Sequence, residues 1–177
     1  MRRNLLLIFT LSLIAACSGI TVSSDYDRDA NFPSYKTYAF TAEAEQLPVG
    51  DIDRKRILDA VASELAKEGF TKSDQPDVWI DLKVAAQQKQ SATATNSGGY
   101  GAGYGYRWGG GFSTTTINVE NYVEGTLFID MIDVSKKQLV WQGRAVKTLD
   151  ENTTAERKEK NIKYAIQQVF LKYPPKK

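Results

Sequence analysis

Apolar and polar residues alternate along two long stretches of the chain, a pattern typical of β-strands with one buried face. The first stretch is DVWIDLKVAAQQKQ, residues 77–90, and the second is TINVENYVEGTLFIDMID, residues 116–133. A third strand is predicted at QLVWQGRAVKTL, residues 138–149, reached through the turn sequence DVSKK. Because the later strands follow one another with no helical pattern between them, we expect them to form an antiparallel meander.

Two segments instead repeat their apolar residues with the period of a helix. The first begins at a candidate N-cap, Asp51, and ends at Gly69. Its apolar stripe consists of Ile57, Leu58, Val61, Ala62 and Leu65. The second begins at Thr153 and Glu156, which are spaced as a capping box, and stops before Pro174. Its stripe consists of Ile162, Ala165, Ile166, Val169, Phe170 and Tyr173. The sequence therefore predicts two amphipathic helices.

Two shorter strands are predicted near the beginning, at ITV (residues 20–22) and KTYAF (residues 36–40). The resulting order, β-α-β-β-β-α, predicts an α+β fold with a mixed, mostly antiparallel sheet of about four to five strands. A right-handed crossover through the first helix would make its two flanking strands parallel. Both helices are expected to cover one face of this sheet.

The N-terminus has the features of a secretory signal. Met1, Arg2 and Arg3 form a positive region, and the apolar run that follows covers residues 5–16. This run is too short to span a bilayer of about 30 Å, but suits the central region of a signal peptide. It ends in Ile-Ala-Ala-Cys at Cys17, which resembles the lipoprotein signal of bacteria. That resemblance implies cleavage before Cys17 and an N-terminal diacylglyceryl cysteine that also carries palmitate. The alternative is an ordinary signal peptide followed by an incidental cysteine.

These features divide the chain into a cleaved signal peptide (1–16), a lipidated tether (17–24) and one α+β domain (25–175). Residue 18 is a serine. In enterobacterial lipoproteins an aspartate at that position signals retention in the inner membrane. The expected location is therefore the outer membrane of a bacterial cell, with the domain lipid-anchored and facing the periplasm.

Charge and composition exclude several classes of function. Lys and Arg number 23 and Asp and Glu 21, so removing Arg2 and Arg3 leaves 21 of each and a neutral chain. A nucleic-acid-binding domain normally has a basic excess, so no nucleic-acid partner is expected. Histidine is absent and the one cysteine is Cys17, which excludes Ser–His and Cys–His catalysis. We therefore expect no catalytic residues, no metal site and no cofactor.

The most unusual segment is NSGGYGAGYGYRWGGGF, residues 96–112. Its glycines fit neither the dinucleotide-binding nor the Walker pattern, so a phosphate-binding loop is not expected. The run lies in a predicted glycine- and aromatic-rich loop over residues 91–115. If extended, it would present an aromatic side that suits sugar rings or lipid headgroups. That side would include Tyr100, Tyr104, Tyr106 and Trp108. The alternative is a low-complexity connection without a binding role.

A second candidate interaction site comes from strand alternation. If the aliphatic residues of the long strands face the helices, then Trp79, Tyr122 and Phe128 face the opposite way. They would lie on the helix-free face of the sheet, among charged residues such as Asp81 and Lys83. Exposed aromatic residues on a sheet face often mark an interaction site. The alternative is that the N-terminal segment or the long loop covers them.

Several segments together resemble the bacterial lipoprotein family of domain of unknown function 4136. They are the following: DYDRDANFPSYKTYAF (25–40), GFTKSDQPDVWIDL (69–82), the glycine-rich run, YVEGTLFIDMIDVSKKQLVWQGRA (122–145) and FLKYPP (170–175). The resemblance implies a compact α+β domain of the bacterial envelope with no agreed activity. It assigns a functional role only to Cys17, the acylated residue.

The function expected from these observations is a non-enzymatic interaction module of the outer membrane. Its anchor is the membrane itself, and its partner is peptidoglycan, lipid or another envelope protein. The competing hypothesis is a small-ligand carrier or a hydrolase with a carboxylate-based site between the helices and the sheet.

Overall fold

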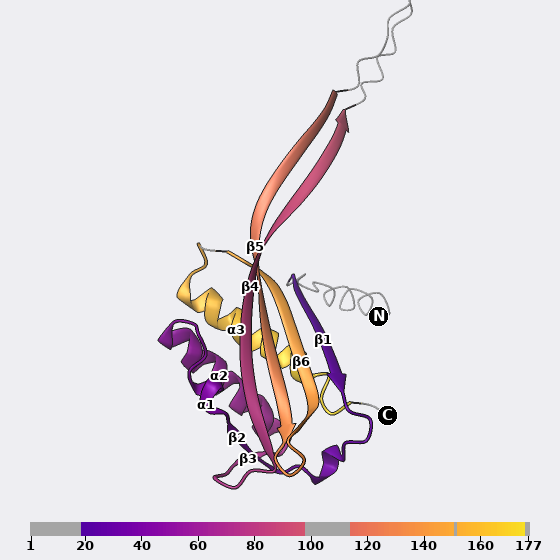
Figure 1. The fold of residues 1–177 in the computed structure, drawn as a ribbon. Helices are drawn as coiled ribbons and strands as arrows, with labels where there is room; N and C mark the ends of the chain where they lie inside the picture. The colour runs from indigo at the N-terminus through magenta and orange to yellow at the C-terminus, as the bar shows by residue number, and fades with distance from the viewer. Residues whose placement is uncertain (1–18, 98–113, 151, 176–177) are drawn as a thin grey trace, which may run out of the picture.

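The computed structural model describes residues 19–97, 114–150 and 152–175 (Figure 1). One mixed sheet of six strands, in the order β1-β6-β5-β4-β2-β3, organises this part of the chain. The strands are β1 (Ile20–Tyr26), β2 (Thr37–Phe40), β3 (Thr71–Lys72), β4 (Val78–Ser97), β5 (Thr114–Asp133) and β6 (Gln138–Leu149). The helices are α1 (Ala42–Glu45), α2 (Asp51–Lys67) and α3 (Ala155–Phe170), with a short 3-10 helix, η1 (Phe32–Ser34).

The predicted α+β class is confirmed, whereas the predicted number of elements was only roughly right. The sequence indicated four to five strands and two helices, and the structure has six strands and three helices. The two additional elements are β3 and α1, which have two and four residues. Elements this short contain too few residues for a hydrophobic period to become visible.

The predicted strand directions are confirmed. Strands β4, β5 and β6 pair as an antiparallel meander. Strands β2 and β4, which flank α2, pair in parallel. Strand β1 pairs antiparallel with β6 at the far edge, from Ile20 opposite Lys147 to Tyr26 opposite Trp141. Residues 20–24, predicted as part of the tether, therefore belong to the sheet, and only a short segment separates Cys17 from β1.

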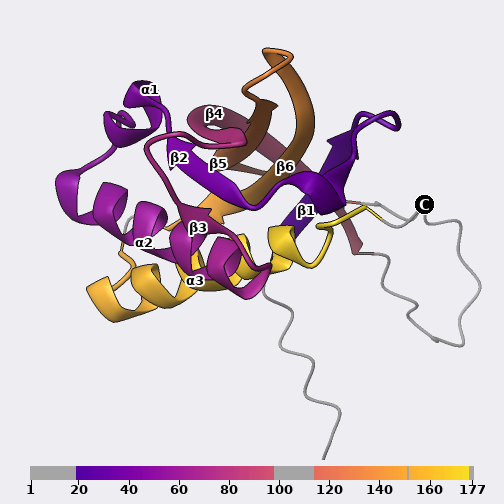
Figure 2. The same ribbon diagram turned by 90° about the horizontal axis from the view of Figure 1, so that it is seen from below.

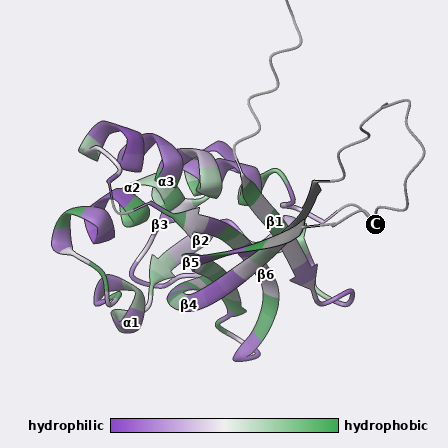
Figure 3. Cartoon of the chain, turned by 90° about the horizontal axis from the view of Figure 1, so that it is seen from above, coloured by the Kyte–Doolittle hydropathy of each residue, from purple (hydrophilic) through white to green (hydrophobic). Residues whose placement is uncertain are grey.

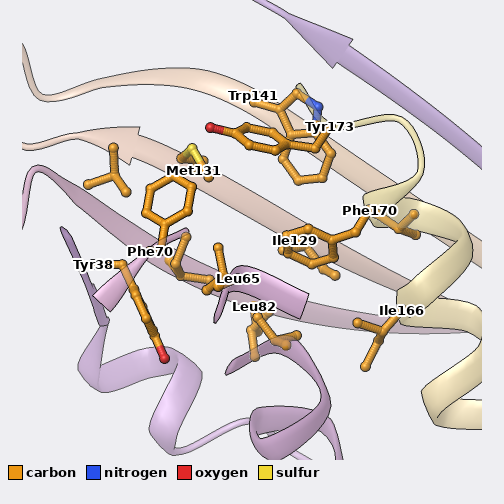
Figure 4. Close-up of a cluster of buried hydrophobic side chains, with 14 of the residues drawn as sticks. Tyr38, Leu65, Phe70, Leu82, Ile129, Met131, Trp141, Ile166, Phe170 and Tyr173 are labelled. Carbon is orange, nitrogen blue, oxygen red and sulfur yellow. The ribbon is translucent and has the colours of Figure 1, made fainter. Parts of the chain in front are cut away.

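The hydrophobic core lies between the sheet and the pair α2 and α3. These two helices lie side by side on one side of the sheet (Figure 2). Ile80, Leu82, Ile129 and Met131 point toward them and are buried. At the other end of the core, Trp141 packs against Phe170 and Tyr173, with ring centroids 5.8 and 5.4 Å apart (Figure 4).

Both predicted helix starts were displaced by one residue. Helix α2 begins after Gly50, so Asp51 is its first residue and not its N-cap. Helix α3 is capped by Thr154, whose hydroxyl accepts a hydrogen bond from the backbone N–H of Arg157. The capping box predicted from Thr153 and Glu156 was therefore wrong by one position. The sequence offered two adjacent threonines and no signal that chooses between them.

Strands β4 and β5 continue well beyond the rest of the sheet. The last pair joining β5 to β6 is Val123 with Leu149, whereas β4 and β5 remain paired as far as Ser97 and Thr114. Figure 1 shows this extension as a two-stranded ribbon that projects from one end of the domain. We call residues 89–97 and 114–122 the arm.

The arm corrects the predicted loop over residues 91–115. Residues 91–97 belong to β4 and residues 114 and 115 to β5, so the connection is shorter than expected. The sequence missed these strand ends because residues 91–97 and 114–115 contain only serine, threonine, alanine and asparagine, which show no hydrophobic period. Tyr100, Tyr104, Tyr106 and Trp108 lie outside the described residues.

Gly143 allows α3 to approach β6 closely. A Cβ atom at this position would overlap Val169 Cγ1 and would lie 2.5 Å from Trp141 Cη2. Both neighbours are fully buried and held by the core, so neither can move aside easily. Gly125, on the neighbouring strand, differs because an added Cβ would meet only the tip of the exposed Leu149 side chain, at 2.9 Å.

We predict that Gly143→Ala lowers the free energy of unfolding by about 1–3 kcal/mol, because it overpacks the contact between β6 and α3. Gly125→Ala is the matched control and should cost less than about 1 kcal/mol, since Leu149 can rotate away. Urea denaturation followed by tryptophan fluorescence measures both. Equal losses in the two variants would contradict this account of Gly143.

Candidate functional site

The side of the meander opposite α2 and α3 carries a row of polar and aromatic side chains. In Figure 3, α2 and α3 lie together along one side of β4, β5 and β6. Strand register places the other set of alternating residues on the opposite side, which we call the open face. Its central residues are Trp79, Asp81, Lys83, Phe128, Asp130, Gln142 and Arg144.

A charged cluster lies at the centre of the open face. Asp81 and Asp130 are directly opposite each other on β4 and β5, and they are only 8% and 5% exposed. The Lys83 ammonium lies 2.8 Å from a carboxylate oxygen of each. Two neutral donors complete the cluster: the Thr41 hydroxyl donates to Asp81 and the Gln142 amide donates to Asp130. One cation therefore bridges two carboxylates that would otherwise repel each other.

The protonation of this cluster suits a structural role better than a catalytic one. Hydrogen bonds to Asp130 and Asp81 raise the pKa of Lys83, so its ammonium stays charged. Burial acts to raise the pKa of Asp81, but its hydrogen bonds to Lys83 and Thr41 outweigh burial and lower it. Both shifts keep Lys83 and Asp81 in their charged forms, which favours the ion pair between them. The bridge therefore joins a charged Lys83 to Asp81 and Asp130.

Phe128 and Trp79 lie on the two sides of this cluster. The Arg144 guanidinium lies 5.7 Å from the centre of the Phe128 ring, within the range of a cation–π contact. Trp79 pairs with Ile132, which in turn pairs with the exposed Leu139, so a small apolar group occupies that end. Phe128 and Ile132 are four residues apart on β5, about 13 Å at 3.3 Å per residue. The charged cluster separates the two aromatic positions.

The predicted aromatic residues therefore share a side of the sheet without forming one patch. Trp79, Tyr122 and Phe128 are all partly exposed. Tyr122 lies farther along, at the base of the arm, opposite Lys89. Lys89 forms an ion pair with Glu124 on the same side. The predicted acylation site, Cys17, lies outside the described residues, as do residues 98–112 of the glycine-rich run.

A third buried carboxylate lies at the end of the sheet away from the arm. Asp133 accepts hydrogen bonds from the Tyr35 hydroxyl, the Ser135 hydroxyl and the Lys136 backbone N–H, at 2.6–2.9 Å. Burial acts to raise the pKa of Asp133, but these hydrogen bonds together lower it to about 2. A cavity of about 460 Å³ borders this residue and Asp77. Asp77 accepts from two backbone N–H groups, so both carboxylates serve to fix loops.

A second groove lies on the helical side of the described domain. This groove of about 950 Å³ runs between α2 and α3 and is lined mainly by charged side chains, among them Glu64, Lys67, Glu156 and Lys160. Within the described ranges, no three acidic, histidine or cysteine side chains converge as metal ligands. Helices in the same ranges are too short or too polar to cross a membrane. Buried hydrophobic side chains lie between the helices and the sheet.

Comparison with known proteins identifies the family. Residues 22–175 match the family described as "Domain of unknown function (DUF4136)". The chain belongs to the DUF4136 family. This confirms membership of the domain family that the sequence segments indicated. No curated protein matches the chain.

The comparison with solved structures concerns the fold alone. A PDZ domain protein from Parabacteroides distasonis matches with a TM-score of 0.55 and 16% identity, over 89% of this chain. The match spans only 37% of that protein. Two structures of the PelC dodecamer from Paraburkholderia phytofirmans match with TM-scores of 0.42 and 0.46 and identities of 13% and 12%. Each covers 85% of this chain and 94% of the other.

Sequence reasoning placed Asp81 and Lys83 on the open face but missed the bridge they form with Asp130. The bridge depends on which residue of β4 lies opposite Asp130, and alternation alone does not determine register. The available signal was the pattern Asp-x-Lys on one strand and a lone Asp on another, all on the polar side.

We predict that Lys83→Met destabilises the fold by about 1–3 kcal/mol, less than breaking a fully buried pair, because the Lys83 side chain is 60% exposed. Removing the cation leaves two buried carboxylates facing each other. Lys89→Met, which breaks the more peripheral pair with Glu124, is the control and should have a much smaller effect. Chemical denaturation at neutral pH compares them, and equal effects would show that Lys83 does not support the sheet.

Proposed function

We propose that this DUF4136 protein is a non-enzymatic lipoprotein of the bacterial outer membrane. Its acyl chains would be attached to Cys17, and the folded domain would face the periplasm. The observation that carries this proposal is the segment Ile14–Cys17, in which small residues precede the only cysteine at the end of an apolar run. The fold is consistent with it, because β1 begins at Ile20, directly after the cleavage point.

The proposed role of the domain is interaction, and the open face is its candidate surface. Trp79, Phe128 and Arg144 combine apolar area with donors and lie on the side that α2 and α3 leave uncovered. The protonation of Lys83 and Asp81 gives no support to a catalytic role for the charged cluster. We propose peptidoglycan, lipid or another envelope protein as the partner, with Tyr100, Tyr104, Tyr106 and Trp108 as further contact residues.

We predict that Cys17→Ala releases the protein from the membrane fraction or leaves it unprocessed, because the acyl chains supply the apolar anchor. Ser18→Ala, at the neighbouring position, should leave processing and membrane fractionation unchanged. Metabolic labelling with a fatty acid and separation of membranes by density measure both variants. Normal cleavage and unchanged membrane association of the Cys17 variant would refute the lipoprotein assignment.

A second prediction concerns the open face. A photo-crosslinking residue introduced at Trp79 or Phe128 should capture one discrete partner in intact cells, because both side chains are partly exposed. The control position is Tyr164, an aromatic residue exposed on α3. Capture of the same products from all three positions, or of none from the open face, would show that this surface is not the interaction site.

A further inference from the structure

One side of the arm carries two apolar pairs, which follow the polar pair Gln90 with Asn121, and the other side is polar. On the apolar side Ala92 pairs with Val119 and Ala94 with Ile117. Val119 and Ile117 are 57% and 64% exposed, although side chains of this type are usually buried. The opposite side carries the polar pairs Ser91 with Glu120 and Thr93 with Asn118. No core alternation is required here, so the amphipathic pattern needs another explanation.

On the same side of the ladder, beyond the polar pair Gln90 with Asn121, the base of the arm carries further apolar residues. Val123 pairs with Leu149, which is 49% exposed. Among the seven large exposed apolar residues of the described chain, Leu149, Val119 and Ile117 fall on this one side. Such an exposed apolar strip on a protein marks a contact surface.

The arm also lacks support from the rest of the fold. From Lys89 and Tyr122 outward, β4 and β5 pair only with each other. An isolated two-stranded ribbon is marginally stable in water and leaves both of its edges unpaired. A surface that receives the apolar side would stabilise the arm.

The predicted anchor attaches at the base of the arm. Ile20 pairs with Lys147, and Lys147 pairs with Gly125, two residues from the Val123 pair at which the arm begins. Figure 1 shows the start of β1 at the end of the domain from which the arm projects. Three peptide units join Cys17 to Ile20, so the acylated residue lies within about 10 Å of Ile20.

This short connection restricts how the domain can lie on a membrane. The arm projects about 30 Å from its base, at 3.3 Å per residue over residues 89–97. The body of the domain extends in the opposite direction, because β1 runs away from the arm. An arm that pointed away from the membrane would push the packed, charged body into lipid. The arm must therefore point into the membrane or lie along it.

Insertion into the membrane is excluded by the chemistry of the arm. Its polar side carries Glu120 and Asn118, and both of its edges have unpaired backbone groups. Hydrocarbon does not tolerate open sheet edges, because their N–H and C=O groups find no partner there. By register, Val119 and Ile117 continue the helix-facing side of β5, but β4 and β5 cross at the base of the arm in Figure 1, so the arm is twisted relative to the sheet. An arm lying along the surface can therefore keep its polar side in water and rest its apolar side on the interface.

We propose that the arm is a membrane-contacting element that lies along the lipid surface to which Cys17 is anchored. Val119 and Ile117 enter the interfacial layer, and Asn118 and Glu120 face the periplasm. This inference rests on the lipid anchor of the proposed function. It adds a second attachment point, which fixes the orientation of the domain so that the open face has a defined direction relative to the membrane.

The test compares two neighbouring positions on opposite sides of the arm. Val119→Cys and Asn118→Cys each introduce one free thiol, because Cys17 is capped in the lipidated protein. Each full-length, lipidated variant is labelled with a polarity-sensitive fluorophore. It is then reconstituted into vesicles of phosphatidylethanolamine and phosphatidylglycerol. Circular dichroism verifies that both variants remain folded, and vesicle flotation tests the anchor separately.

We expect the label at position 119 to shift to the blue and to be quenched several-fold more strongly by lipid-borne nitroxides than the label at position 118. Equal quenching of the two labels in protein that floats with vesicles would overturn the arm proposal and leave the anchor intact. Failure to float would overturn the anchor and this inference together. A blue shift at position 119 without lipid, growing with protein concentration, would also overturn it and identify a second copy as the occupant.

Discussion

The pairing of β4 with β5 is the constraint on which the rest of the structure depends. It runs without interruption from Val78 opposite Asp133 to Ser97 opposite Thr114. Because side chains alternate along a strand, this one register determines which residues meet the helices and which form the open face. Half of the ladder supports the core, and the other half continues into the arm. A slip of one residue would exchange the buried and exposed sets along the strand that moved.

The two faces of the meander are stabilised by different interactions. On the helix side, Trp141 occupies the space that Gly143 leaves free, and α3 closes over both. That contact depends on shape and excludes even one added methyl group. On the open face, Lys83 compensates two buried carboxylates that face each other across the strands. That contact depends on charge, so it holds the register of β4 and β5 without a covering layer.

The sequence predicted those helices and strands in which one buried face requires apolar residues at regular spacing. The stripe from Ile57 to Leu65 identified α2, and the alternation from Val78 to Val84 identified the core half of β4. The arm part of β5 was largely predicted, but the end of β4 was missed because Gln88 and Gln90 interrupt the alternation of apolar residues. The displaced cap at Thr154 shows a second limit, since the choice between adjacent threonines depends on where α3 meets the sheet.

The candidate site was predictable only in part. The alternation along a strand shows which face of the sheet a residue is on, but not which residue of the next strand lies beside it. Alternation correctly placed Trp79 and Phe128 on the same side of the sheet. It gave no means of seeing that the Asp81–Lys83–Asp130 cluster lies between them, since that depends on cross-strand register. The position of β1 beside the base of the arm likewise required the pairing of Ile20 with Lys147, which are far apart in the sequence.

The independence of the arm from the core has a consequence for how this fold can vary. Beyond Val123 no third strand constrains the ladder, so residues can be added or removed in matched pairs without disturbing the packing of Trp141 or α3. Because the side-chain period is two, such changes must come in even steps on each strand if the apolar side is to stay in place. The arm can therefore become longer or shorter by matched insertions or deletions, with little effect on the stability of the domain.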